Sequence, residues 1–172
     1  IKAITVRTHE AAIRIIDKKG PLHNPADRDH AMQYMIAIPL IFGRLTASDY
    51  EDAIASDARI DLLRDKMTCV EDPPFTADYH DPETRAISNA LTVTFQDGST
   101  LPEVVVEYPI GHRRRREEGI PKLLAKYKVN RNRVYAGKQQ TQLLDKTLDY
   151  ETFRNLAVNE LTDLLAIPYP VR

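Results

Sequence analysis

Two segments in which hydrophobic and polar residues alternate flank an Asp97-Gly98 dipeptide, and this arrangement constrains the fold more than any other feature. Hydrophobic residues at positions 91, 93 and 95 alternate with polar ones, and a second alternating segment covers residues 104–108. Alternation is typical of strands with one buried face, and Asp-Gly between two such strands is typical of a hairpin turn. We expect residues 87–96 and 103–108 to pair antiparallel, with Pro102 leaving the loop length open.

The remaining chain predicts an α+β fold. Two more strands are expected, at residues 1–7 and 67–70, with Ile4 and Val6 on one side of the first. A helix capped by Thr8 is expected over residues 9–17, and shorter helices after Thr46 or Ser48 and after Asp57. The sequence therefore predicts a small mixed or antiparallel sheet of about four strands with helices packed on it.

Two longer segments complete this prediction. Residues 71–83 contain three prolines, which favour an ordered loop over the surface. Residues 109–118 are expected as a loop, and residues 120–166 have a helical pattern that Pro168 and Pro170 end. Its best part places five hydrophobic residues on one helical face: Tyr150, Phe153, Ala157, Leu161 and Leu164.

Residues 23–43 are expected to form a central helix. Asn24 is a suitable N-cap and Pro25 suits the first helical position, while Pro39 should kink or end the helix near residue 38. Asp27, His30 and Tyr34 follow the spacing i, i+3, i+7 and would share one side of the helix.

A histidine and a phenol on one helix face could transfer a proton. The alternative is a surface histidine beside a half-buried tyrosine, and the spacing of His30 and Tyr34 leaves both interpretations open.

Composition excludes several classes of function. The formal net charge of −1 provides no overall field for nucleic acid or an anionic membrane. Cys69 is the only cysteine, which excludes an internal disulfide and a cluster held by several cysteines of this chain. No apolar segment approaches the roughly 20 residues that span a bilayer. The five histidines include no His-x-x-x-His pair, so no metal site is expected.

A run of four arginines follows His112 and offers a second candidate site. Arg113 to Arg116 could form a solvated charge run partly neutralised by Glu117 and Glu118, or part of a nucleic-acid surface, which no interleaved aromatic residues support. The third interpretation is binding of a carboxylate, because guanidinium groups match carboxylates with two parallel hydrogen bonds. One loop could aim only one or two of these arginines at a ligand.

Several motifs give the chain a resemblance to a known family. Residues 24–34, which read Asn-Pro-Ala-Asp-Arg-Asp-His-Ala-Met-Gln-Tyr, and residues 106–121 around the arginine run are the two long motifs. Shorter ones are Gly43, the Asp97-Gly98 turn, Lys126-Tyr127 and residues 158–161. With these motifs the sequence resembles the C-terminal part of the 2-methylcitrate dehydratase branch of the MmgE/PrpD family, over nearly its whole length.

The resemblance implies a lid domain over residues 1–172 of a longer enzyme, which begins with a large helical domain absent from this chain. It implies cofactor-free loss of water from 2-methylcitrate, giving 2-methyl-cis-aconitate in the methylcitrate cycle of propionate catabolism. Alternatives are a decarboxylase or isomerase acting on a related tricarboxylate such as cis-aconitate, or a non-catalytic assembly domain. A dimer is implied, located in the cytoplasm of a bacterium or the mitochondrial matrix of a eukaryote.

The resemblance also implies roles for individual residues. Tyr34 matches a lid tyrosine that faces the substrate, and His30 matches a position that is histidine in only some branches of the family. Both are candidate catalytic residues. The candidate residues for binding the tricarboxylate are four cationic or imidazole side chains in the two long motifs: Arg28, His112, Arg113 and Arg114. Most other catalytic residues of the family would lie outside this chain, and no metal ligand is implied.

Overall fold

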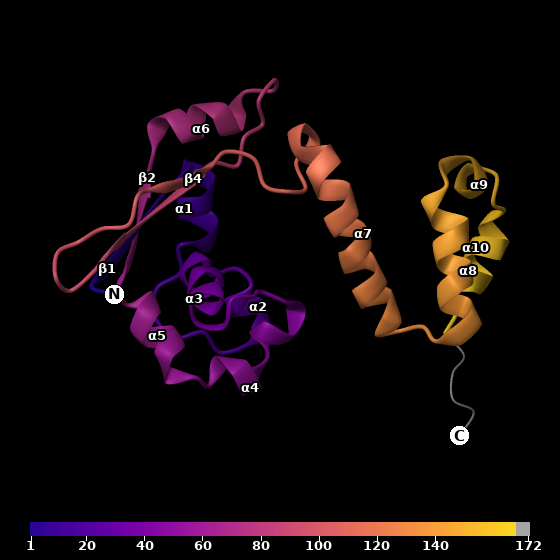
Figure 1. The fold of residues 1–172 in the computed structure, drawn as a ribbon, viewed down its shortest axis with the longest axis horizontal. Coiled ribbons are helices and arrows are strands. Elements are labelled where there is room, and N and C mark those ends of the chain that lie inside the picture. The colour runs from indigo at the N-terminus through magenta and orange to yellow at the C-terminus, as the bar shows by residue number, and fades with distance from the viewer. Residues whose placement is uncertain (168–172) are drawn as a thin grey trace. The chain divides into compact units, whose positions relative to one another are not determined.

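The computed structural model describes residues 1–167 of the 172-residue chain (Figure 1). The chain divides into two compact units, Ile1–Pro109 and Ile110–Arg172, and the second is described up to residue 167. Each unit is treated separately below. That residues 1–172 form a single domain of a longer enzyme stays a prediction.

The first unit contains a four-stranded mixed sheet, which confirms the predicted α+β class. Its strands are β1 (Ala3–Thr8), β2 (Met67–Glu71), β3 (Asn89–Thr94) and β4 (Val104–Val106), in the order β2-β1-β3-β4. Strand β1 pairs parallel with β2 and antiparallel with β3, and β3 pairs antiparallel with β4. The predicted strands therefore all exist, with ends shifted by a few residues.

The turn between β3 and β4 is the one that Asp97-Gly98 predicts. Gly98 N–H donates to the Phe95 carbonyl at 3.1 Å, and Phe95 N–H donates to the Ser99 carbonyl at 2.8 Å. Gly98 has φ +84°, a left-handed conformation that glycine adopts without steric cost. This pattern is typical of a three-residue hairpin loop that ends in a left-handed residue, and it places Pro102 beyond the turn.

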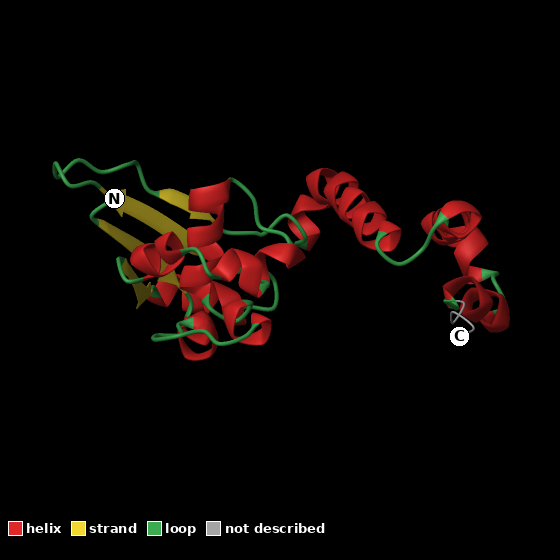
Figure 2. Cartoon of the chain, turned by 90° about the horizontal axis from the view of Figure 1, so that it is seen from below, coloured by secondary structure: helices red, strands yellow, loops and turns green. Residues whose placement is uncertain are grey.

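One face of the sheet forms the core with several helices of this unit (Figure 2). Ile4 and Val6 of β1 are 1% and 2% exposed, and they pair with Val93 and Leu91 of β3 on that same inner face. The alternation that predicted the strands thus corresponds to burial, because successive side chains of a strand point to opposite faces.

The helices of the first unit are mostly short. They are α1 (Glu10–Ile16), α2 (Pro25–Arg28), α3 (Met32–Phe42), the 3-10 helix η1 (Ala47–Tyr50), α4 (Asp52–Ala55), α5 (Ala58–Arg64) and α6 (Pro73–His80). Helix α3 packs against α5, and Ala37, Ile38 and Ile60 are buried at this contact with at most 1% exposure. Asn24 caps α2 and Asp57 caps α5, as predicted.

The central helix differs from the prediction in two ways. It is interrupted at residues 29–31, where α2 ends and Ala31 becomes the N-cap of α3. The prediction that Asp27, His30 and Tyr34 share one side of a helix is therefore wrong, because this arrangement requires one continuous helix. Helix α3 also continues through Pro39 to Phe42 and ends at Gly43, which has φ +68°. Of the two predicted effects of Pro39, an end of the helix near residue 38 is wrong, and a kink there stays a prediction.

Two other local predictions are wrong. The proline-rich segment contains helix α6, which Asp72 caps by accepting from Phe75 N–H, with Pro73 in the first turn. Proline there needs no backbone N–H partner, so Asp-Pro-Pro starts a helix. Helix α1 is capped by His9 and not by Thr8: His9 Nδ1 accepts from Ala12 N–H at 3.3 Å.

The second unit is helical throughout its described part. It contains the 3-10 helix η2 (Arg113–Arg115), α7 (Arg116–Asn132), α8 (Gly137–Leu148), α9 (Tyr150–Arg154) and α10 (Val158–Leu165). The arginine run is thus helical and not a loop. A break at residues 155–157 separates Tyr150 and Phe153 from Leu161 and Leu164, so the predicted continuous face does not exist. Pro168 and Pro170 lie outside the described residues.

The second unit buries little of its own hydrophobic surface. Leu143 of α8 is 1% exposed, whereas Tyr150 is 69% exposed and Val158 is 78% exposed. Across the described residues of both units, no helix has the length and hydrophobicity to cross a membrane.

Candidate functional site

The interruption between α2 and α3 places the three candidate residues of the first unit in different surroundings. Arg28, at the end of α2, is 6% exposed, and Tyr34, in the first turn of α3, is 2% exposed. The side chain of His30, in the connection between these helices, is 58% exposed. The structure therefore buries Arg28 and Tyr34 and leaves His30 at the surface.

Tyr34 and Arg28 both hold the backbone of the same neighbouring segment. The Tyr34 hydroxyl donates to the Asp49 carbonyl at 2.6 Å, and Arg28 Nη1 donates to the Tyr50 carbonyl at 2.7 Å. Arg28 Nη2 also lies 2.7 Å from a carboxylate oxygen of Asp52. The rings of Tyr34 and Tyr50 stack with centroids 5.9 Å apart. Two residues of the first long motif thus fix the position of residues 49–52.

Burial raises the pKa of the Tyr34 hydroxyl, so the phenol stays protonated at neutral pH and donates a hydrogen bond. In this structure the acceptor is a backbone carbonyl. For Tyr34 to contact a substrate, its hydroxyl must first leave the Asp49 carbonyl.

Asp49 is a buried carboxylate that the sequence interpretation missed. Its side chain is fully buried, accepts from Thr46 N–H and Oγ1 at 2.7 Å each, and pairs with Arg44 Nη2 at 2.9 Å. Burial by itself would raise the pKa of Asp49, but these hydrogen bonds and the charge of Arg44 outweigh it and lower the pKa. A signal was present, because Thr-x-x-Asp before a helix follows the capping-box pattern.

His30 has an acidic neighbour that orients its ring. Its Nδ1 contacts the carboxylate of Asp29, the preceding residue, and both side chains are largely exposed. A carboxylate on one ring nitrogen fixes the tautomer and leaves the other nitrogen available for proton transfer. Among the candidates of the first unit, His30 is the one that a ligand can reach without a structural change.

The remaining candidates lie in the second unit. His112 caps η2, with its Nδ1 accepting from Arg114 N–H at 3.1 Å. Arg113 and Arg114 are exposed, while Arg115 binds Glu118 through Nε at 3.1 Å and Nη2 at 2.7 Å. The ion pair engages Arg115 with the first turn of α7, and how many of the four arginines would contact a ligand stays a prediction.

A close backbone approach holds the arginine segment against α7. A Cβ atom added at the buried Gly119 would lie 2.2 Å from the carbonyl oxygen of Ile110. Residues 110 and 119, at the two ends of this segment, therefore approach each other closely, and only glycine at position 119 permits this contact.

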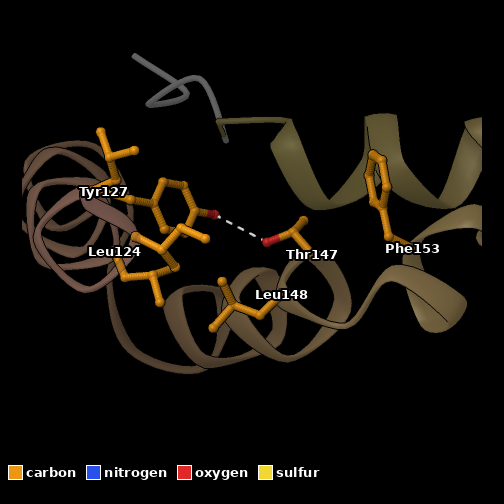
Figure 3. Close-up of a pocket in the computed structure, with 7 residues that line it drawn as sticks. Leu124, Tyr127, Thr147, Leu148 and Phe153 are labelled. Carbon is orange, nitrogen blue, oxygen red and sulfur yellow. Dashed lines mark hydrogen bonds between the residues drawn. The ribbon is translucent and has the colours of Figure 1, made fainter. Parts of the chain in front are cut away.

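The second unit also has an apolar groove of about 420 Å³ between α7, α8 and α9 (Figure 3). Its polar groups include the Tyr127 hydroxyl and Thr147 Oγ1, which lie 3.4 Å apart. Leu124, Leu148 and Phe153 contribute to the remaining lining, which contains no cation. This groove lacks the charged groups that would bind a carboxylate.

Neither a metal site nor a reactive thiol accompanies these candidates in the described residues. No group of three or more His, Cys, Asp or Glu side chains in residues 1–167 could hold a metal ion. Burial raises the pKa of the Cys69 thiol to about 12, so this cysteine is protonated at neutral pH.

Gly119→Ala is expected to disturb the arginine segment, because the added methyl group would overlap the Ile110 carbonyl. We expect destabilisation of roughly 1–3 kcal/mol, the usual cost of overpacking, measured by urea unfolding. Gly111→Ala is the matched control, since a Cβ there meets no atom within 4 Å. Equal stability of the two variants would contradict the close approach.

Comparisons with known proteins agree with the resemblance seen in the motifs. The 2-methylcitrate dehydratase of Salmonella typhimurium (strain LT2) is 63% identical over 167 residues, which cover 97% of this chain and 35% of that protein. The enzyme of the same name from Escherichia coli K12 is 62% identical over the same shares. The mitochondrial 2-methylcitrate dehydratase of Yarrowia lipolytica is 56% identical, covering 95% of this chain and 31% of that protein.

These comparisons define the family and the part of it that is present. The chain spans about a third of the length of the curated relatives it matches. Residues 1–150 match the family described as the MmgE/PrpD C-terminal domain. The chain therefore belongs to the MmgE/PrpD family and contains its C-terminal domain.

Proposed function

We propose that this chain is the C-terminal part of a 2-methylcitrate dehydratase, a hydro-lyase that converts 2-methylcitrate to 2-methyl-cis-aconitate in propionate catabolism. The observation that carries the proposal is 63% identity over 97% of the chain to an enzyme of that name. The motifs with the candidate residues lie inside this matched length.

The reaction sets physical requirements that the candidate residues meet only in part. A base must remove a proton beside a carboxylate, an acid must assist the departing hydroxyl, and cations must bind three carboxylates. His30 is the exposed acid–base candidate, and the exposed Arg113 and Arg114 are cations that suit carboxylates. The other groups would come from the rest of the longer protein, which we propose as the partner of this chain.

The two buried candidates, Arg28 and Tyr34, have different roles in this proposal. Arg28 would support the substrate site by holding residues 50–52, and Tyr34 would act on the substrate after its hydroxyl leaves the Asp49 carbonyl. We also propose a homodimer that needs no cofactor. Relatives occur in bacteria and, by name, in mitochondria, so we propose the cytoplasm or the mitochondrial matrix according to the source.

The central test compares the full-length protein with this chain alone. We expect the full-length protein to dehydrate 2-methylcitrate and the isolated chain to be inactive, because most proton-transfer and carboxylate-binding groups would be missing. Product formation is followed by absorbance of the new double bond, with citrate and cis-aconitate as comparison substrates. Preferred turnover of cis-aconitate would instead indicate the decarboxylase or isomerase alternative.

Replacing Arg113 and Arg114 together by Gln is expected to raise the KM of the full-length enzyme for 2-methylcitrate. The effect should shrink at high salt, because exposed charges are screened. Lys138→Gln with Arg154→Gln is a control that removes the same charge from exposed positions of the second unit. An equal KM change in both double variants would assign the effect to overall charge and not to binding by the arginine run.

Tyr34→Phe separates a catalytic from a structural role of the hydroxyl. Loss of its hydrogen bond to Asp49 should lower stability by about 1–2 kcal/mol. If the hydroxyl also acts on the substrate, kcat of the full-length enzyme should fall by roughly tenfold to a thousandfold. Tyr50→Phe, which alters the stacked neighbour, is the control. Full kcat together with a lower Tm would show that Tyr34 is structural.

A further inference from the structure

His9 is a buried histidine that the proposed site does not use. It is 6% exposed and precedes α1, where its Nδ1 accepts from Ala12 N–H at 3.3 Å. The nitrogen of Ala12 also lies 3.1 Å from the His9 carbonyl oxygen, so its N–H is shared between two acceptors of the same residue. Nδ1 accepts only when it carries no proton, so this cap requires the neutral ring with its proton on Nε2.

Helix α6 holds the ring of His9 in this orientation. The rings of His9 and Tyr79 stack with centroids 4.2 Å apart and an interplanar angle of 9°. Beside them, the N–H of Glu10, the first residue of α1, donates to Thr76 Oγ1 of α6 at 2.9 Å. The start of α1 therefore meets α6 through a stacked pair of rings and a hydrogen bond, which involve His9 and the residue after it.

The charged and titratable groups around His9 favour its neutral form on balance. Burial and the nearby His80 of α6 lower the pKa of His9, and they outweigh Glu10, which raises it. The Glu10 carboxylate also pairs with Arg14 at 3.3 Å, on the following turn of α1. Tyr79 presents the face of its ring, which attracts a cation and offsets part of the cost of charging His9.

Two further carboxylates lie where β2 joins α6. Glu71 accepts from Thr76 Oγ1 at 2.9 Å, and Asp72 caps α6 and pairs with Arg7. Both are held by these partners and not by His9. Glu10 is therefore the carboxylate that acts on the imidazole, and its effect is the smallest of the three causes that shift the pKa of His9.

Protonation of His9 opposes the cap for three reasons. It places an N–H on Nδ1 against the N–H of Ala12, and it adds positive charge beside the free N–H groups at the start of α1. It also adds a charge near that of protonated His80. When the start of α1 separates from α6, the ring reaches solvent and binds a proton with the ordinary histidine pKa of about 6.5.

We propose that His9 is a pH-sensitive cap, which holds α1 against α6 at neutral pH and loosens this contact in mild acid. Well above pH 6.5 the ring is neutral in the closed and the opened state, and the contact is fully stabilised. As the pH falls below that value, the opened state takes up a proton that the closed state resists, so opening becomes easier. This device does not depend on the proposed dehydratase activity.

Amide hydrogen exchange of the 172-residue chain at pH 7.5 and pH 5 tests the proposal, after correction for the intrinsic exchange rate at each pH. Protection of the Glu10 and Ala12 N–H groups should fall about three- to tenfold at pH 5, the value of one hydrogen bond. NMR titration of the His9 ring should show the Nε2–H tautomer at pH 7.5 and a pKa below 6.5. A His9 pKa at or above that of an ordinary histidine would overturn the proposal.

Two variants assign the response to the cap. His9→Asn keeps a side chain that can cap α1 but does not titrate, so protection of Glu10 and Ala12 should be equal at the two pH values. His23→Asn is the matched control, because His23 is exposed and precedes α2, and it should retain the parent's response. An equal loss of protection in both variants would assign the response to other groups and refute the proposal.

A third variant tests the cap without altering it. His80→Gln removes the neighbouring imidazole from an exposed position at the end of α6 and should keep the fold. The pKa of His9 should then rise toward the ordinary value, and the loss of protection at pH 5 should become smaller. An unchanged His9 pKa would contradict the arrangement of α1 and α6 on which the proposal rests.

Discussion

Hydrogen bonding along both edges of β1 is the interaction on which the first unit depends. This six-residue strand pairs parallel with β2 on one side and antiparallel with β3 on the other. It thereby joins segments that are more than 60 residues apart in the chain. Ile4 and Val6 face the helices, so a shift of one residue in register would move both from the core to the surface. The position of α3, and with it of Tyr34, follows from that inner face.

The sequence predicted those parts of the fold that depend on local patterns. Alternation identified β1, β3 and β4, the strand at residues 67–70 was predicted as a short segment without that pattern, and Asp97-Gly98 identified the hairpin through its left-handed glycine. The break between α2 and α3 was missed, because the residues around His30 continue a helical pattern. Helix α6 was missed because its prolines were read as loop residues and not as a helix start.

The candidate site was less predictable, because its geometry depends on contacts between distant segments. Spacing placed Tyr34 beside His30, whereas packing against residues 49–52 buries the tyrosine and leaves the histidine exposed. The burial of His9 against Tyr79 likewise leaves no trace in local sequence, since it arises where α1 meets α6. Roles for His112, Arg113 and Arg114 came from motifs, and their place in a complete site stays a prediction.

The carboxylate of Asp49 makes the stability of this part of the molecule depend on pH. Its pKa is lower in the folded chain than in an unfolded one, so its stabilising effect is complete above the ordinary aspartate pKa. As the pH falls through the lowered value, the carboxylate takes up a proton and its bonds to Thr46 and Arg44 weaken. The carbonyl of this same residue accepts from Tyr34. Strong acid would therefore loosen the segment that holds the tyrosine hydroxyl in place.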